Sequence, residues 1–216
     1  MNLDSEVLGA ATLDRQQVTG LVLCGGASSR MGQAKATLPW GDADLLGRTL
    51  KLLREHCETL LLATGSEEQY TERNCTVVLD RAQGLGPLAG LEAGLAKART
   101  TWVLALACDL PRLAKPVIEG LLQAASKRNH AQVVVWNCRG RIEPLCCLLR
   151  RSCLDAVSAA LDSGERRMIS FWKGTPEHGA LHVQELTASL EIEAALANVN
   201  TPADWEAVSS QRKPTQ

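Results

Sequence analysis

Short apolar runs alternate with amphipathic segments along this chain, and that alternation limits the possible folds more than any other feature. The runs are rich in Val and Leu and too short for buried helices, which is typical of strands covered on both faces. They are Val18–Leu23, Thr59–Ala63, Thr76–Leu79, Trp102–Cys108 and Gln132–Trp136.

The segments between the runs place apolar residues three and four positions apart, as one face of a helix requires. They are Leu45–His56, Pro87–Ala98 and Lys115–Lys127. Pro87 and Pro116 suit a first helical turn, where the missing N–H has no partner to lose. The alternation predicts an α/β fold, a Rossmann-like three-layer sandwich whose mostly parallel sheet has helices on both faces.

The pattern changes after Trp136. The segment Asn137–Arg141 contains Gly140 and predicts a turn, after which Leu145–Leu149 returns as an antiparallel strand. The remaining predicted elements are helices at Leu154–Leu161 and Arg166–Lys173, a strand at Leu181–Leu186, and a helix at Pro202–Arg212 capped by Thr201.

The 216 residues predict one domain over 18–210, with a polar N-terminal extension at 1–17 and a polar tail at 211–216. A net charge of −1 argues against electrostatic capture of nucleic acid. No apolar run approaches the ~20 residues that cross a membrane, and the N-terminus lacks a signal-peptide pattern. We therefore expect a cytoplasmic protein with no nucleic-acid or membrane partner.

The eight cysteines are expected to be reduced thiols, and no C-x-x-C pair indicates zinc. His178 and His182 have a metal-ligand spacing only on a helix, but Gly179 lies between them and Pro176 just before. An ordinary surface or strand pair is the better interpretation of these two histidines.

The most informative segment follows the first predicted strand and reads Leu23-Cys24-Gly25-Gly26-Ala27-Ser28-Ser29-Arg30-Met31-Gly32-Gln33-Ala34-Lys35. Its place at the carboxyl end of a strand is where open α/β folds bind ligands. Glycines let backbone N–H groups approach phosphates, and two cations supply the charge that a triphosphate requires. The loop is not a Walker A motif, because no Lys-Ser or Lys-Thr follows Gly32. The alternative, a flexible glycine turn with solvated basic residues, does not use both cations.

This loop resembles the signature of the molybdenum cofactor guanylyltransferase (MobA-like) family and its cytidylyl- and sugar-nucleotidyl relatives. The resemblance continues, in the family's order, through four further motifs. They are Gly84-Leu85-Gly86-Pro87-Leu88-Ala89-Gly90-Leu91, Cys108-Asp109-Leu110-Pro111, Glu143-Pro144-Leu145 and Asn198-Val199-Asn200-Thr201-Pro202. Together they span about Thr19 to Trp205, nearly the whole chain.

The resemblance implies a Mg²⁺-dependent nucleotidyltransferase that moves GMP from GTP to molybdopterin. Arg30, Lys35 and Asp109 would be its catalytic residues, and Asp109 its metal ligand. The implied partners are GTP, molybdopterin, and other proteins that make or receive the molybdenum cofactor. The implied nucleotide contacts are Leu23, Cys24, Gly25, Gly26, Lys35, Asp80, Asp109, Asn198 and Asn200.

Several of these residues also have a plainer interpretation. Asp109 ends a buried strand, where its carboxylate suits Mg²⁺ shared with phosphates, or it caps a helix that begins near Pro111. Asp80 closes another strand and, considered alone, is typical of a turn. Asn198 and Asn200 would share one side of an extended stretch, or serve as a polar lead-in to the last helix.

Two features bear on the ligands. The pair Arg166 and Arg167, at a predicted helix start where cations do not help the dipole, indicates an anionic acceptor or simply solvated charge. The family tends to carry an asparagine where this chain has Thr64, so Thr64 or Ser66 would supply a hydroxyl instead.

Rival functions differ in the ligand. Gly-Gly at Gly25-Gly26 favours guanine within the family, where cytidylyl relatives tend to have Ala-Gly, so a cytidylyl- or sugar-phosphate transferase is the alternative. The Gly84-x-Gly86-x-x-x-Gly90 spacing also suits a dinucleotide-binding turn, which would leave the first glycine loop unexplained. A non-catalytic nucleotide-binding protein of the same fold is the third alternative.

Overall fold

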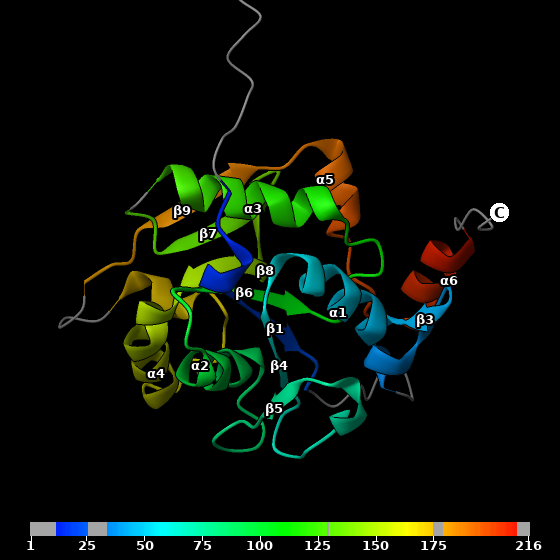
Figure 1. Cartoon of the computed structure of the whole chain (residues 1–216), viewed down its shortest axis with the longest axis horizontal. Helices are drawn as coiled ribbons and strands as arrows, with labels where there is room; N and C mark the ends of the chain where they lie inside the picture. Colours follow the sequence, from blue (N-terminus) through cyan, green and yellow to red (C-terminus); the bar gives the residue numbers. More distant parts are fainter. Residues whose placement is uncertain (1–11, 26–33, 129, 175–178, 211–216) are drawn as a thin grey trace, which may run out of the picture.

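A seven-stranded sheet forms the centre of the computed structural model, which describes residues 12–25, 34–128, 130–174 and 179–210 (Figure 1). The strand order is β5-β4-β1-β6-β8-β7-β9. The strands are β1 Val18–Leu23, β4 Thr59–Ala63, β5 Thr76–Val78, β6 Trp102–Ala107, β7 Val133–Cys138, β8 Arg141–Arg150 and β9 Val183–Thr187. In this sheet, as far as the structure describes it, β8 alone runs antiparallel to its neighbours.

Helices cover both faces of this sheet, which confirms the predicted three layers (Figure 1). On one face α1 Leu45–His56, α3 Lys115–Lys127 and α5 Leu190–Ala195 pack against one apolar cluster. On the other face α2 Pro87–Lys97 and α4 Leu154–Asp162 pack against a second. Every residue of β1 and β6 is buried, because helices above and below exclude water from both sides.

The start of α1 shows how local sequence positions these helices. Asp44 accepts a hydrogen bond from the Gly47 N–H at 2.7 Å, so the helix begins with a satisfied N-cap. Leu46, Leu50 and Leu53 then fall on one face and are fully buried against the sheet. The predicted span of this helix is confirmed at both ends.

The turn between β7 and β8 confirms the predicted antiparallel return. Arg139 and Gly140 both have positive φ, at 53° and 85°, which is the backbone of a two-residue hairpin turn. β8 then pairs with both β7 and β6. The antiparallel strand thus enters the sheet next to β6, the strand whose end carries Asp109.

The predicted helix at Arg166–Lys173 is wrong. Only Ser170–Lys173 forms a short 3-10 turn, and Gly164, at a φ of 87°, ends α4 instead of leading into a new helix. The Arg166 guanidinium donates to the Leu161 carbonyl at 3.3 Å and to the Glu165 carbonyl at 2.7 Å. Its charge therefore lies at a helix C-terminus, where a cation is favourable.

The other predicted elements differ from the structure only at their ends. Among the α-helices and strands of the described residues, three were not predicted: α5, and the short strands β2 Pro39–Trp40 and β3 Ala43–Asp44, which form a hairpin. The last helix, α6, covers Pro202–Ser210 and lies at the edge of the molecule beside β3 (Figure 1). The predicted division into an extension, one domain and a tail stays a prediction, since residues 1–11 and 211–216 lie outside the described ranges.

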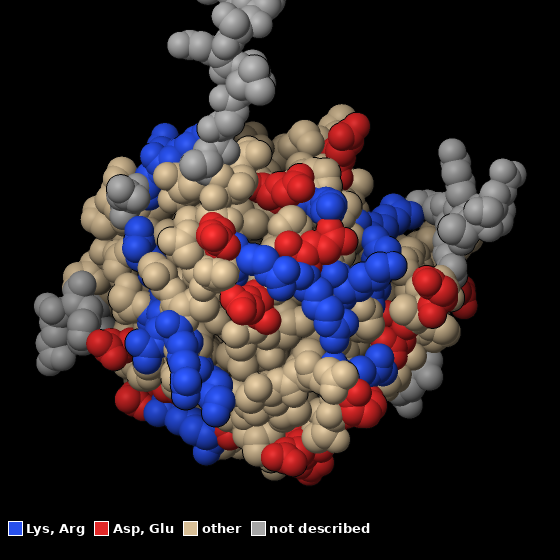
Figure 2. Space-filling model, in the orientation of Figure 1, with Lys and Arg blue, Asp and Glu red and all other residues tan. Residues whose placement is uncertain are grey.

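The surface carries both signs of charge. Figure 2 shows Lys and Arg side chains gathered in two groups on the face with α1, α2 and α3, each with Asp and Glu beside it. Among the described residues, no helix combines the length and apolar character that a membrane span requires.

Candidate active site

The glycine loop leaves β1 at the edge of the sheet where β4 and β6 also end. The N–H groups of Cys24 and Gly25 both donate to the Ala63 carbonyl at 2.9 Å, which ties the start of the loop to the end of β4. A Cβ on Gly25 would lie 2.3 Å from the Gly65 nitrogen. Glycine is therefore required at position 25 because two backbone segments touch there.

A small pocket opens beside this contact, and the second glycine segment lines it. The Asp80 N–H donates to the Gly65 carbonyl at 2.8 Å, which fixes Asp80 at the rim. A Cβ on Gly90 would lie 2.9 Å from the Ala63 Cβ, so only glycine lets α2 approach β4 this closely. The lining residues are Leu23, Gly25, Ala63, Gly65, Asp80, Gly86, Pro87 and Gly90. Residues of both glycine segments thus line one pocket.

Asp80 is a carboxylate without a protein partner in this pocket. Its Oδ1 atom is buried and makes no hydrogen bond. Burial, and secondarily the nearby charge of Glu92, raises the pKa of Asp80 above its usual value. A ligand that donates hydrogen bonds would satisfy this oxygen, as a ribose hydroxyl or the N–H groups of a base can.

Lys35 lies on the other side of the site, in the short 3-10 turn Lys35–Thr37, and joins two predicted residues. Its Nζ atom donates to Asp109 Oδ2 at 3.2 Å and to Asn200 Oδ1 at 2.9 Å. The side chains of Lys35 and Asp109 are only 19% and 14% exposed, so this ion pair is partly shielded from water. Residues far apart in the sequence thus meet at one ammonium group.

Asn200 belongs to an extended stretch that follows α5. The Val199 N–H donates to the Asp109 carbonyl at 3.0 Å, and the Val199 side chain is fully buried. Asn198 and Asn200 lie on either side of Val199 in the sequence, so the predicted shared face is the one opposite the core. Asp204 accepts hydrogen bonds from the N–H groups of Asn200 and Thr201, which lowers the pKa of the Asp204 carboxyl.

The arrangement fits a divalent cation at Asp109. The Asp109 Oδ1 atom is buried and makes no hydrogen bond, so a hard oxygen donor is left for a ligand. Asp109 does not cap a helix, because α3 begins only at Lys115. Within the described residues no three His, Cys, Asp or Glu side chains converge, so any such ion would depend on ligand oxygens as well.

Some predicted residues cannot be placed in this way. Gly26 and Arg30 lie outside the described residues, as does His178. Leu23 and Cys24 form the floor at the end of β1, and the Cys24 Sγ donates to the Ala63 carbonyl at 3.4 Å. Burial raises the pKa of the Cys24 thiol to about 12, so it stays protonated and unreactive.

Thr64 does not offer its hydroxyl proton to a ligand. The side chain is almost fully buried, and its Oγ1 atom donates to the Glu67 carbonyl at 2.6 Å. Ser66, two residues on, is exposed. Of the two residues suggested in place of the family asparagine, the structure favours Ser66 as a donor.

Glu143 is a buried acid near the site to which the sequence assigned no role. Only 5% of it is exposed, and burial raises the pKa of its carboxyl, with a smaller contribution from the charge of Asp109. The sequence signal was a single acid before Pro144 at the start of an apolar strand. Its nearest cation, Arg141, is 3.8 Å away and largely exposed.

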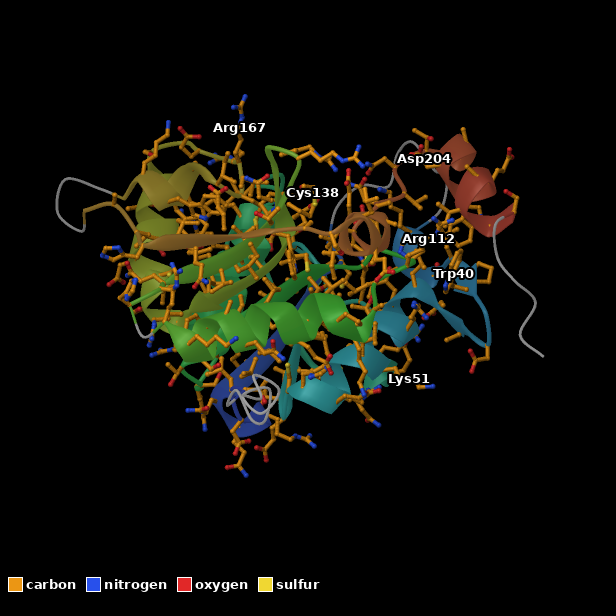
Figure 3. The ribbon with its side chains drawn as sticks, turned by 90° about the horizontal axis from the view of Figure 1, so that it is seen from above. Trp40, Lys51, Arg112, Cys138, Arg167 and Asp204 are labelled. Atoms are coloured by element: carbon orange, nitrogen blue, oxygen red, sulfur yellow. The ribbon has the colours of Figure 1, made fainter. Side chains whose placement is uncertain are left out.

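Arg166 and Arg167 behave differently from one another. Arg166 caps α4, as described above, and its backbone oxygen lies 3.8 Å from where a Gly86 Cβ would be. Arg167 is exposed and points away from the molecule (Figure 3). Neither side chain converges on Lys35 or Asp109, so an anionic acceptor at this pair stays a prediction.

Known proteins share both sequence and fold with this chain. Residues 20–180 match a family model described as a MobA-like NTP transferase domain. A probable molybdenum cofactor guanylyltransferase of Carboxydothermus hydrogenoformans is 37% identical over 191 residues, which covers 88% of this chain and 94% of the relative. The molybdenum cofactor guanylyltransferase of Pseudomonas aeruginosa is 34% identical over 188 residues, covering 84% and 89%.

Solved structures share the fold at lower identity. The molybdopterin-guanine dinucleotide biosynthesis protein A of Archaeoglobus fulgidus superposes with a TM-score of 0.72 at 19% identity, over 90% of this chain and all of the other. The 2-C-methyl-D-erythritol 4-phosphate cytidylyltransferase of Thermus thermophilus gives 0.62 at 16% identity, over 88% and 98%. The architecture is therefore one that guanylyl- and cytidylyltransferases both use.

Proposed function

The chain belongs to the MobA-like NTP transferase family, and from this premise we propose that it transfers GMP from GTP to the terminal phosphate of molybdopterin. Pyrophosphate leaves, and the product is the guanine dinucleotide form of the cofactor. The acceptor is proposed from the relatives' names, because pocket geometry alone does not identify a pterin. The reaction class is supported by the site.

The observation that carries the proposal is the meeting of Lys35, Asp109 and Asn200 beside the first glycine segment. Phosphoryl-group transfer needs fixed positive charge and a metal-binding oxygen at the reacting phosphate, with little covalent chemistry from the protein. Lys35 supplies the charge and the free Asp109 Oδ1 supplies the oxygen. A non-catalytic nucleotide-binding protein would not require that buried oxygen to remain without a partner.

The chain's own groups are given the following roles in this proposal. The Cys24 and Gly25 N–H groups are already bonded to the Ala63 carbonyl, so the triphosphate is assigned to Lys35, Arg30 and N–H groups further along the glycine loop, which offset its negative charge. Asp109 would hold Mg²⁺, which when bound offsets the charge that builds on the departing pyrophosphate. An acceptor phosphate oxygen forms a bond to the α-phosphorus as the bond to pyrophosphate breaks, so no protein nucleophile is needed.

The Asp80 pocket would receive the nucleoside. Its unpaired oxygen is complementary to N–H and O–H donors, and guanine offers two adjacent donor groups, N1–H and the N2 amino, where cytosine offers the N4 amino alone. A base that left Asp80 unpaired would incur the desolvation of a buried carboxylate. This complementarity and the Gly25-Gly26 pair both favour GTP over CTP.

A pyrophosphate-release assay with the four nucleoside triphosphates, with and without molybdopterin, tests the proposal directly. We expect release only with Mg²⁺ and molybdopterin, and GTP preferred over CTP by at least about 100-fold in kcat/KM. Equal or better turnover with CTP would overturn the guanylyl assignment and leave the reaction class standing. Tight GTP binding without any release would instead indicate a binding protein of the same fold. We propose a cytoplasmic location, consistent with eight free thiols.

A further inference from the structure

Two tryptophans meet at the outer side of the site, and neither belongs to the hydrophobic core. The rings of Trp40 and Trp205 have centroids 5.6 Å apart and planes tilted by 59°, an arrangement that aromatic pairs favour. Both are half-buried. By contrast, Trp102 and Trp136 are buried in the core.

The two rings come from the same pair of chain segments that meet at Lys35. Trp40 follows Lys35 by five residues, in the β2–β3 hairpin, and Trp205 follows Asn200 by five residues, in α6. Lys35 and Asn200 are themselves joined by the 2.9 Å hydrogen bond. Figure 3 shows Trp40 beside α6, so the ring contact and the hydrogen bond connect the same two segments.

The ring contact matters because α6 lies at the surface of the molecule. None of the α6 residues Pro202–Ser210 is buried. Its first turn is nevertheless tightly bonded to Asn200, since Asp204 accepts from the Asn200 N–H at 2.9 Å and from the Thr201 N–H at 2.8 Å. The Asp204 N–H donates in return to Thr201 Oγ1 at 3.1 Å. The position of α6 therefore contributes, together with the buried Val199 next to Asn200, to where the exposed Asn200 amide points.

We propose that Trp205, packed on Trp40, is a positioning residue for the nucleotidyl transfer. The ring pair holds α6 in place, so that the Asn200 amide oxygen stays hydrogen-bonded to the Lys35 ammonium group. Lys35 is a long side chain whose ordering costs rotamer entropy, and the pair keeps the side chain ordered before the substrate arrives. The inference rests on the proposed function, because it takes Lys35 as a group of the transfer site.

A contact that acts through Lys35 should change turnover more than nucleotide affinity. The glycine loop and the Asp80 pocket still bind the ground state, whereas charge stabilisation at the reacting phosphate depends on a preorganised ammonium group. An aromatic pair contributes about 0.5–1.5 kcal/mol beyond its buried area, so we expect kcat to fall roughly 3- to 10-fold in Trp205→Ala. The dissociation constant for GTP should stay within about twofold.

The experiment compares Trp205→Ala, Trp205→Phe and Trp40→Ala with Trp172→Ala as the matched control. Trp172 is also half-buried and packs edge-on against Phe171, away from Lys35. We expect Trp205→Phe to retain most of kcat, because a ring remains, and Trp172→Ala to leave kcat unchanged. Trp40→Ala should lower kcat as much as Trp205→Ala, and the double variant should lower it no further.

A double-variant cycle with Asn200→Ala separates positioning from general stability. In the Trp205→Ala background, Asn200→Ala should cost much less than it does in the wild type, because the amide is already displaced. Fully additive losses, or an unchanged kcat in Trp205→Ala, would overturn the proposal. If Trp205→Ala does not fold, Trp205→Leu keeps apolar volume while removing the ring geometry, and the same comparisons apply.

A hydrogen-exchange measurement distinguishes a failure of this inference from a failure of the proposed function. Asp204 protects the N–H groups of Asn200 and Thr201, so both should exchange several-fold faster in Trp205→Ala and at the wild-type rate in Trp172→Ala. If the wild type releases no pyrophosphate under any condition, the proposed function fails, and exchange alone decides whether the pair holds the segment. Unchanged exchange rates in Trp205→Ala would contradict the positioning role of the ring pair, even if the activity of the variant is reduced.

Discussion

The two sides of the site each present an aspartate at the end of a strand, yet the aspartates are held in opposite ways. One carboxylate oxygen of Asp109, Oδ2, accepts a hydrogen bond from Lys35, whereas the other, Oδ1, is buried and has no hydrogen-bond partner. Asp80 also has a buried oxygen without a partner, but the charge that acts on it is that of another acid, Glu92. A cation lies beside one carboxylate and an anion near the other.

This difference separates two kinds of ligand. A carboxylate that has an ammonium group on one oxygen and a free second oxygen can share a divalent ion with phosphates. A carboxylate without a counter-charge is satisfied best by neutral N–H and O–H donors. For the proposed function, we therefore expect the phosphates and metal at the Asp109 side and the nucleoside at the Asp80 side.

The largest expected effect is at Asp109. Asp109→Asn keeps the size of the side chain and removes the negative charge, so kcat/KM should fall by about 10³-fold or more, the scale of losing a metal and its charge stabilisation. A titration with Mg²⁺ during the pyrophosphate-release assay measures this. The loss should persist at saturating Mg²⁺.

A readout that does not depend on activity complements this titration. Mn²⁺ binding in the presence of GTP, followed by electron paramagnetic resonance, should weaken strongly in Asp109→Asn and change little in Asp80→Asn. Wild-type activity of Asp109→Asn at low Mg²⁺ would exclude the metal role and transfer it to the Asp80 side.

Lys35 is expected to have the next largest effect. Lys35→Ala should leave the fold intact, because Lys35 belongs to neither apolar cluster, and lower kcat/KM by roughly 10²–10³-fold. Turnover and circular dichroism measured on the same preparation check both halves of this statement. Near-normal turnover in the folded variant would show that the ammonium group does not stabilise the reacting phosphates.

Asp80→Asn should give the opposite pattern, with a moderate loss of activity and a gain of stability. Losing a hydrogen bond to a charged acceptor corresponds to about 1.5–3 kcal/mol, or a roughly 10- to 100-fold rise in KM for GTP. Because burial raises the pKa of Asp80, the ionised form destabilises the folded protein at neutral pH, and the amide removes that penalty.

The pH dependence of stability tests whether Asp80→Asn stabilises the folded protein, as expected. The folded state binds the Asp80 proton more tightly than the unfolded state, so the penalty is absent below the unfolded pKa and complete above the raised folded one. Melting temperatures of Asp80→Asn and wild type should therefore coincide in strong acid and separate as the pH rises, with the variant higher. An Asp80→Asn protein that melts below the wild type at pH 7 would contradict this account.

The sequence predicted these two sides unequally well. The strands β1 and β4 and the helix α1 were predicted to the residue, because their patterns of apolar residues depend only on local spacing. The meeting of Lys35 with Asn200 was not predictable from spacing, since it depends on the C-terminal segment returning to β6 through the Val199 N–H. Only the family resemblance placed Asn200 at the site.

The C-terminal part also contains the clearest error. Arg166–Lys173 has a plausible helical pattern, but Gly164 adopts a positive φ and lets the chain reverse. The Arg166 guanidinium then finds carbonyl partners at the end of α4, which local propensity cannot anticipate. Tertiary contacts override pattern most easily where the apolar periodicity is short.

The smallest expected effect distinguishes a capping arginine from a substrate-binding one. The Arg166 guanidinium donates to the Leu161 carbonyl at 3.3 Å and the Glu165 carbonyl at 2.7 Å, so it stabilises the end of α4. Arg166→Ala should therefore lower the free energy of unfolding by about 0.5–1 kcal/mol, measured by denaturant titration, and leave the KM for molybdopterin unchanged. Arg167→Ala is the matched control, because that side chain is exposed and points outward, and it should change stability by less than about 0.5 kcal/mol.

A rise in the KM for molybdopterin in either variant, with KM for GTP unchanged, would instead show that this pair faces the acceptor. The site would then extend past both aspartates, and the contrast between the Asp80 and Asp109 sides would describe only its nucleotide half.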